Sequence, residues 1–177
     1  FICLNFCKYR LIDLPKSQYL VFDVVYYAFV FFRDHFMKEF ISFETYANDA
    51  IKLADMIKKT GRTFKSIIVI TRGGLFPATI LSAQLNIKKI DTFCLASYSN
   101  KVGGEIQELK KPVIDLKDAL FVDDLSDSGN TARYVKHVYP DAFFACVYVK
   151  EHGKDYPDLY VKEFPQDTWL VQPWEID

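Results

Sequence analysis

The sequence predicts an α/β domain with a mostly parallel central sheet flanked by helices. Short runs rich in β-branched residues, such as SIIVIT at 66–71, contain no alternating polar positions, which is typical of strands covered on both faces. Segments with apolar residues at helical spacing separate these runs, as in sheets whose parallel strands are joined by helices. The chain has 177 residues, of which 50% are apolar and 25% are charged, so one domain of ordinary size can bury a core.

The first helix is expected after Ser42, whose hydroxyl can cap it, and it ends at Gly61 after a basic last turn. Pro77 suits the first turn of a second helix, which continues to Asn86. The apolar positions of the first helix are Tyr46, Ala50, Leu53, Ala54 and Ile57. The other expected elements are strands at 66–71, 91–98, 119–124 and 142–150, a polar loop at 99–104, and a helix at 131–138 closed by Pro140.

The first thirty-six residues are more apolar than the rest of the chain. The most apolar run, 19–32, is shorter than the ~20 residues of a membrane span, and it contains Asp23. No small-residue cleavage site of the signal-peptide kind follows it. We expect residues 1–36 to be an N-terminal extension and the folded domain to comprise 37–177. A buried element of the fold and a segment that binds the inner face of the membrane stay open as alternatives.

Charge and cysteine content limit the classes of partner and compartment. The formal net charge is -1 and the pI is near 6.3, so the chain has no overall basic field for nucleic acid. The cysteines have no C-x-x-C spacing, and the three histidines are too scattered to indicate a metal site or a triad. We expect reduced thiols and a cytoplasmic protein. The cysteines are Cys3, Cys7, Cys94 and Cys146.

Unusual residues stand where three of the predicted strands end. A turn at 72–74 follows one strand, Asp123 and Asp124 end another, and Lys150 ends a third. Each has a plain explanation, as a tight turn, a solvated corner or a lysine at a strand end. In parallel sheets, however, ligands bind beyond the carboxyl ends of the strands. Their occurrence at three equivalent ends therefore predicts a ligand site.

The segment 120–131, LFVDDLSDSGNT, combines two kinds of recognition. Backbone N–H groups at the start of the next helix, together with the hydroxyls of Ser128 and Thr131, suit a phosphate monoester. Asp123 and Asp124 are acceptors only, so they suit hydroxyl groups or a hydrated cation. A sugar phosphate offers both kinds of group within one small molecule.

FVDDLSDSGNT resembles the phosphoribosyl pyrophosphate (PRPP) signature of the type I phosphoribosyltransferases. ITRGGLFPATILSAQL, IDTFCLASY and PQDTWLVQPW resemble the corresponding segments of the bacterial xanthine-guanine enzymes, and the likeness covers about 40–175. It implies the type I phosphoribosyltransferase fold with a small C-terminal hood for the base. It also implies a purine-salvage transferase that moves the 5-phosphoribosyl group from PRPP to N9 of a 6-oxopurine, such as xanthine, guanine or hypoxanthine, giving the nucleoside monophosphate and pyrophosphate.

The resemblance also implies a role for each matching residue. Asp123 and Asp124 hold the ribose hydroxyls and Mg²⁺, the segment after them wraps the 5′-phosphate, and Arg72 binds pyrophosphate beside a cis peptide between Arg72 and Gly73. Asn130 stands where related enzymes usually carry glycine, but asparagine tolerates a left-handed conformation, so we expect an intact loop. The PRPP-binding residues implied are Arg72, Gly73, Gly74, Asp123, Asp124, Leu125, Ser126, Asp127, Ser128, Gly129, Asn130 and Thr131.

For the base, the resemblance implies that Asp127 contacts N7 and accepts a proton, with Arg72 as the second catalytic residue. Lys150 donates to the 6-oxo group, and Trp169 stacks on the ring beside Leu170. A donor at this place makes adenine a poor substrate. The family assembles as homodimers or homotetramers, so we expect a homo-oligomer that binds PRPP and a base but no nucleic acid.

Departures from the family pattern leave alternatives open. The loop at 97–105 begins with the matching Ser97 and Tyr98 and is expected to close over the site, but it lacks the family's basic residue, a role that Lys101 can fill. The chain also stops soon after Trp174, which can loosen the base pocket. A PRPP-binding regulator without activity is the main rival, and a transferase for hypoxanthine and guanine alone or for a pyrimidine is the other.

Overall fold

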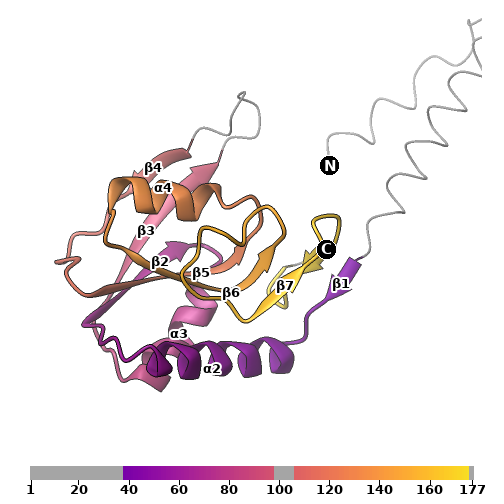
Figure 1. Ribbon diagram of the computed structural model, residues 1–177, viewed down its shortest axis with the longest axis horizontal. Helices are drawn as coiled ribbons and strands as arrows, with labels where there is room; N and C mark the ends of the chain where they lie inside the picture. Colours follow the sequence, from indigo (N-terminus) through magenta and orange to yellow (C-terminus); the bar gives the residue numbers. More distant parts are fainter. Residues whose placement is uncertain (1–37, 98–105, 176–177) are drawn as a thin grey trace, which may run out of the picture. The chain divides into compact units, whose positions relative to one another are not determined.

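The computed structural model describes residues 38–97 and 106–175 of the chain. Six strands form a central sheet in which every neighbouring pair is parallel except β3 with β4 (Figure 1). The prediction of a mostly parallel sheet is confirmed. In spatial order the strands are β4 (Ile106–Lys110), β3 (Ile90–Ser97), β2 (Ser66–Thr71), β5 (Ala119–Ser126), β6 (Phe143–Lys150) and β7 (Lys162–Phe164).

Helices cover both faces of the sheet. Helices α2 (Phe43–Lys59) and α3 (Leu75–Leu85) lie on one face, and α4 (Asn130–Val138) lies on the other (Figure 1). Alternate residues of β2 enter two separate apolar cores, with Ile67 on the α2 side and Ile68 on the α4 side. Burial on both faces is the reason that this strand has no polar alternation.

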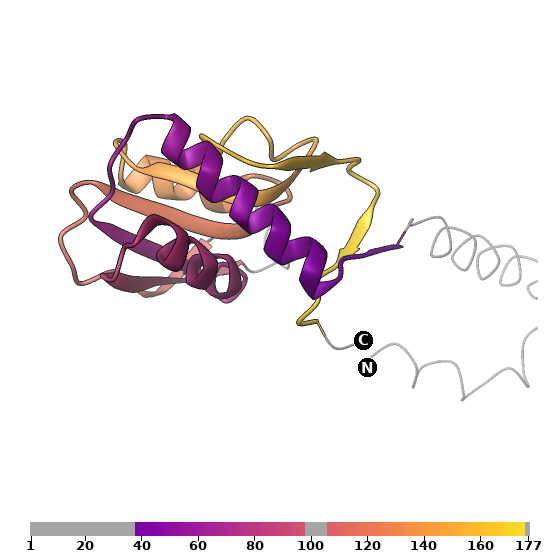
Figure 2. The ribbon, with the colours of Figure 1, turned by 90° about the horizontal axis from the view of Figure 1, so that it is seen from below.

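Local sequence signals explain where the helices begin and end. The Ser42 hydroxyl accepts a hydrogen bond from the Thr45 N–H at 3.0 Å, which caps α2 as predicted. Asn86, at the end of α3, adopts the left-handed conformation with φ 54°. Figure 2 shows α2 running across the face of the sheet. The predicted core positions of α2 are all buried, namely Tyr46, Ala50, Leu53, Ala54 and Ile57.

Four strands were not predicted: β1 (Lys38–Phe40), β4, β7 and β8 (Trp169–Val171). Strands β1 and β8 pair in a second, two-stranded sheet, continued by a 3.0 Å bond from the Ile41 N–H to the Val171 carbonyl. Three of the four are three residues long, which is too short for a periodic pattern to emerge. Strand β5 also runs two residues beyond its predicted end at Asp124, because Leu125 and Ser126 keep pairing with β6.

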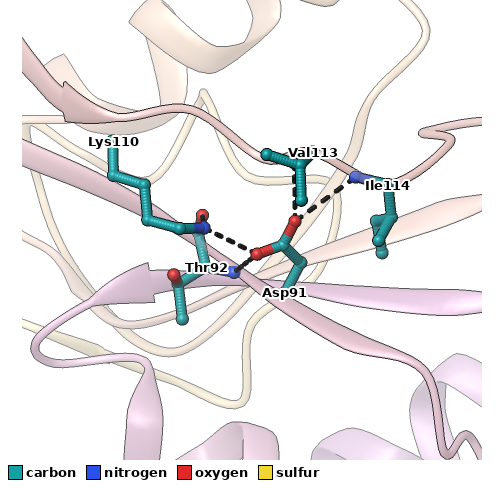
Figure 3. Close-up of polar contacts among 5 residues, drawn as sticks. All are labelled: Asp91, Thr92, Lys110, Val113 and Ile114. Atoms are coloured by element: carbon teal, nitrogen blue, oxygen red, sulfur yellow. Dashed lines mark hydrogen bonds and ion pairs between the residues drawn. The ribbon is translucent and has the colours of Figure 1, made fainter.

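Asp91, at the start of β3, holds the chain that follows β4 (Figure 3). Its carboxylate accepts hydrogen bonds from the Lys110 ammonium at 2.6 Å, the Thr92 N–H at 2.7 Å and the Val113 N–H at 2.6 Å. The bond from Lys110, ahead of the backbone bonds, lowers the pKa of Asp91 below its usual range although its partial burial opposes this. The β3–β4 hairpin is thereby fixed at the end away from its loop.

The structure tests the predictions for two of the cysteines and for membrane-spanning helices. Cys94 and Cys146 are free cysteines, as predicted, and Cys146 is buried. Over residues 38–97 and 106–175, no helix is long and apolar enough to cross a membrane. The predictions for 1–36, with Cys3 and Cys7, and for the loop from Tyr98 onward lie outside the described residues, so these stay predictions.

Candidate active site

The three strand ends singled out in the sequence lie side by side. Strand β5 lies between β2 and β6 in the sheet, and all three run parallel. Their carboxyl ends therefore bring together the 72–74 turn, the acidic pair and Lys150. This arrangement gathers residues from positions far apart in the sequence at one edge of the sheet.

The turn after β2 packs tightly against β5. A Cβ atom on Gly73 would collide with the Asp124 carboxylate, and one on Gly74 would collide with the Val122 carbonyl oxygen. Both glycines are therefore needed for the close approach of the two strand ends. The cis peptide lies at Thr71–Arg72, so the predicted position between Arg72 and Gly73 is wrong by one residue. The bond that departs from trans is the one at which β2 ends and the turn begins.

Asp123, which is buried, and Asp124, which is partly buried, form a pair of neighbouring carboxylates near the end of β5. The Asp124 N–H donates to Asp123 Oδ1 at 3.0 Å, and the Leu125 N–H donates to Asp124 Oδ1 at 2.8 Å. Burial raises the pKa of both groups, and the neighbouring charge of Asp124 raises that of Asp123 further. A site that disfavours two negative charges in this way favours a bound cation.

The hydroxyl of Tyr46 is an unsatisfied polar group. Its ring is fully buried, and the hydroxyl has no hydrogen-bond partner in the part of the chain that the structure describes. Burial raises the pKa of Tyr46, and the charges of Asp124 and Asp123 raise it further. Sequence reasoning treated Tyr46 as a core residue only, because an apolar face at helical spacing carries no sign of a functional hydroxyl.

The acidic pair fits Mg²⁺ in one particular way. Among the described residues, no three acidic, histidine or cysteine side chains converge on one point, so a cage made wholly of protein ligands is not formed there. Mg²⁺ is commonly held by one or two carboxylates together with substrate phosphates and water. Asp123 and Asp124 supply ligands of that number and chemistry.

The loop after β5 leads into the start of α4 and is the segment in which the sequence predicted a site for the 5′-phosphate; we call residues 126–131 the phosphate loop. Asp127 and Ser128 are exposed, Gly129 has φ 75°, and Asn130 opens α4. A Cβ atom on Gly129 would collide with the ring of Tyr156, so both space and conformation require glycine there. The left-handed conformation falls on Gly129, whereas Asn130 is helical. The loop therefore does not depend on the ability of Asn130 to adopt a left-handed conformation.

Two residues of the predicted PRPP-binding set are engaged inside the protein. The buried Ser126 hydroxyl donates to the Gly153 carbonyl at 2.9 Å, which joins the phosphate loop to the turn after β6. The Leu125 side chain packs against the apolar core on the α2 side. Thr131 is partly buried in the first turn of α4.

Two of the groups predicted to contact the base, Lys150 and Asp127, meet at the phosphate loop. Lys150 Nζ lies 3.0 Å from Asp127 Oδ2, with the lysine side chain 7% exposed and the aspartate side chain 51% exposed. Trp169, the first residue of β8, is 53% exposed, whereas Leu170 is buried. Gln166 Nε2 donates to the other oxygen of Asp127, Oδ1, at 2.7 Å. Gln166 was not predicted as a site residue although it belongs to the PQDTW segment, because a single polar residue in a loop carries no signal of its partner.

Comparison with known proteins identifies the family. The family model described as phosphoribosyl transferase domain matches residues 42–177. The chain belongs to the phosphoribosyltransferase family. Its fold is the type I phosphoribosyltransferase fold that the sequence motifs predicted.

Solved structures agree with this assignment. Purine phosphoribosyltransferase from Pyrococcus horikoshii is 28% identical, with 79% of this chain and 95% of that chain covered at a TM-score of 0.68. Xanthine-guanine-hypoxanthine phosphoribosyltransferase from Helicobacter pylori is 23% identical, with 78% and 94% covered at a TM-score of 0.67. Hypoxanthine-guanine phosphoribosyltransferase from L. donovani is 17% identical, with 71% and 83% covered at a TM-score of 0.59. The latter two likenesses concern the fold.

Proposed function

We propose that this phosphoribosyltransferase transfers the 5-phosphoribosyl group of PRPP to N9 of a 6-oxopurine, namely xanthine, guanine or hypoxanthine. The observation that carries the proposal is the buried Lys150, which pairs with Asp127 of the phosphate loop at 3.0 Å. Gln166, three residues before the exposed Trp169, donates to the same carboxylate at 2.7 Å. A buried ammonium needs an acceptor, and a 6-oxo group can share that role with the carboxylate.

On the PRPP side, each part of the substrate has a matching group. The N–H groups at the start of α4, with Ser128 and Thr131, suit the 5′-phosphate, since the helix dipole favours an anion there. Asp123 and Asp124 suit the ribose hydroxyls and Mg²⁺. Arg72 is exposed at the end of β2, where it can reach the pyrophosphate. The chemistry that a bound Mg²⁺ supplies is neutralisation of the departing pyrophosphate's charge.

The base side selects for a 6-oxopurine. The Lys150 ammonium is a hydrogen-bond donor only, so it can donate to the 6-oxo group. It leaves the 6-amino group of adenine, which is also a donor, without a partner. Trp169 is exposed enough to offer a face of its ring to the base, as we predicted from the sequence. Lys150 and the broad ring of Trp169 together favour a 6-oxopurine over the smaller ring of a pyrimidine.

The residues then assist one bond exchange. The bond between C1 of the ribose and pyrophosphate breaks as N9 of the base forms a bond to C1. The base becomes positively charged, and Asp127 offsets that charge and accepts the proton at N7. General acid–base help of this kind is typically worth about 10²–10⁴-fold. Arg72 stabilises the negative charge that grows on the leaving group.

The assay that tests this function uses purified protein with PRPP, Mg²⁺ and a single base in each reaction. We expect nucleoside monophosphate from at least one of xanthine, guanine and hypoxanthine, and none from adenine. Turnover of adenine alone would contradict the role of Lys150. PRPP binding without turnover of any base would favour the regulatory reading instead. A cytoplasmic location and a homodimer or homotetramer are part of the same proposal, and sizing in solution checks the latter.

A further inference from the structure

Gln166 connects three segments around the proton acceptor. Its Nε2 donates to Asp127 Oδ1 at 2.7 Å, and its Oε1 accepts from the His152 N–H at 3.0 Å. Asp127 belongs to the phosphate loop, His152 to the turn after β6, and Gln166 to the segment that leads into Trp169. One amide therefore ties the phosphate loop to the segment that carries the stacking platform.

The direction of this amide is fixed by its partners. The His152 N–H is a donor only, so the atom of Gln166 that faces it must be the oxygen, and the nitrogen must face Asp127. The turn that holds His152 is itself fastened to the phosphate loop. The Ser126 hydroxyl donates to the Gly153 carbonyl, and a Cβ atom on Gly153 would collide with the Ser126 carbonyl oxygen.

Asp127 needs the hydrogen bond from Gln166 because its other partner, Lys150, is also proposed to bind the base. The Asp127 side chain is 51% exposed and lies in a loop, so little packing orients it. Lys150 donates to Oδ2 of Asp127, but in the proposed reaction Lys150 must also donate a hydrogen bond to the 6-oxo group of the base. Gln166 has no group of the substrate to serve, so its bond to Oδ1 keeps the carboxylate oriented while the base binds.

We propose that Gln166 is a positioning residue, which orients the Asp127 carboxylate toward N7 of the base and fixes it relative to Trp169. This inference rests on the proposed function, because it assigns Gln166 a role through the proton acceptor. Gln166 is a neutral donor, so it orients the Asp127 carboxylate without offsetting the carboxylate's negative charge. That charge is needed to stabilise the base when it becomes positively charged. A second cation at this place would weaken that charge.

The test compares two substitutions at Gln166 with a matched control. In Gln166→Glu the side chain keeps its length and can still accept from the His152 N–H, but it repels Asp127 instead of donating to it. Gln166→Ala removes both bonds. Gln84→Ala changes an exposed glutamine of α3, on an element that supplies no hydrogen bond to Asp127. The readouts are kcat, KM for the base, KM for PRPP and the thermal midpoint.

We expect both Gln166 variants to lose about 10- to 100-fold in kcat/KM for the base, the usual weight of a hydrogen bond to a charged group. KM for PRPP should stay within about twofold of wild type, since the side chain to which Gln166 donates is Asp127, which the proposed function assigns to N7 of the base. Wild-type kcat/KM in Gln166→Glu would overturn the inference. Equal losses for base and PRPP, together with a lowered thermal midpoint, would show a purely structural role and overturn it too. Absence of turnover in the wild type would refute the proposed function itself.

Discussion

Gly129→Ala is the sharpest test of how the phosphate loop is built. Gly129 has φ 75°, and a Cβ atom there would collide with the Tyr156 ring. Gly61 has almost the same conformation, φ 72°, but its Cβ atom would meet nothing within 4 Å. The two substitutions therefore share the cost of a left-handed alanine and differ in the steric cost.

The two magnitudes follow from this difference. A left-handed conformation costs a non-glycine residue roughly 1–2 kcal/mol, so Gly61→Ala should destabilise by about that amount. Forcing an extra methyl group into occupied space adds typically about 1–3 kcal/mol, so Gly129→Ala should cost roughly 2–5 kcal/mol in total. For a domain of this size each kcal/mol lowers Tm by about 2–8 °C.

Thermal unfolding of the two single variants measures this, and Tyr156→Ala completes the cycle. In the Tyr156→Ala background the collision is gone, so Gly129→Ala should cost no more than Gly61→Ala does. We also expect Gly129→Ala to raise KM for PRPP, because the loop N–H groups shift. Equal losses of Tm for Gly129→Ala and Gly61→Ala, or no relief from Tyr156→Ala, would refute the packing described here.

Three further predictions concern charged groups. Lys150→Met keeps the aliphatic part of the side chain but removes the donor, so kcat/KM for 6-oxopurines should fall roughly 10- to 100-fold. The control, Lys154→Met, breaks the surface pair with Glu163 and should leave kcat/KM unchanged. Asp91→Asn should destabilise by about 1–3 kcal/mol at neutral pH; because folding lowers the pKa of Asp91, the Tm difference from wild type should shrink as pH falls below about 4. Asp123→Asn removes the buried member of two neighbouring carboxylates that repel each other, so at neutral pH Tm should rise, by an equivalent of about 1 kcal/mol. Isothermal titration should show PRPP binding with Mg²⁺ weakened at least tenfold.

Much of the framework could be predicted because its signals are local. Ser42 caps α2 by a bond three residues along the chain, and the run at 66–71 is apolar because β2 is buried on both faces. The gathering of the 72–74 turn, the acidic pair and Lys150 followed from one rule about parallel strands. These predictions needed no knowledge of which distant segments meet.

The missed features depend on long-range partners. β1 and β8 are short and pair across most of the chain, so neither carries its own signal. Gln166 looks like any polar loop residue until the fold places it 2.7 Å from Asp127. We expected Asn130 to need tolerance for a left-handed conformation because related enzymes carry glycine there, but Gly129 adopts that conformation and packs against Tyr156. Such details follow from packing rather than from sequence pattern.

The sheet ends at β4 on one side and at β7 on the other, and both strands carry charge. In β4, Glu108 pairs with Lys111 at 2.8 Å, and Lys110 pairs with Asp91 at 2.6 Å. In the three-residue β7, Lys162 pairs with Glu39 at 3.1 Å and Glu163 pairs with Lys154 at 2.8 Å. Short, ion-paired border strands give another chain a poor template for extending the sheet. The two border strands therefore disfavour edge-to-edge pairing between the sheets of neighbouring molecules.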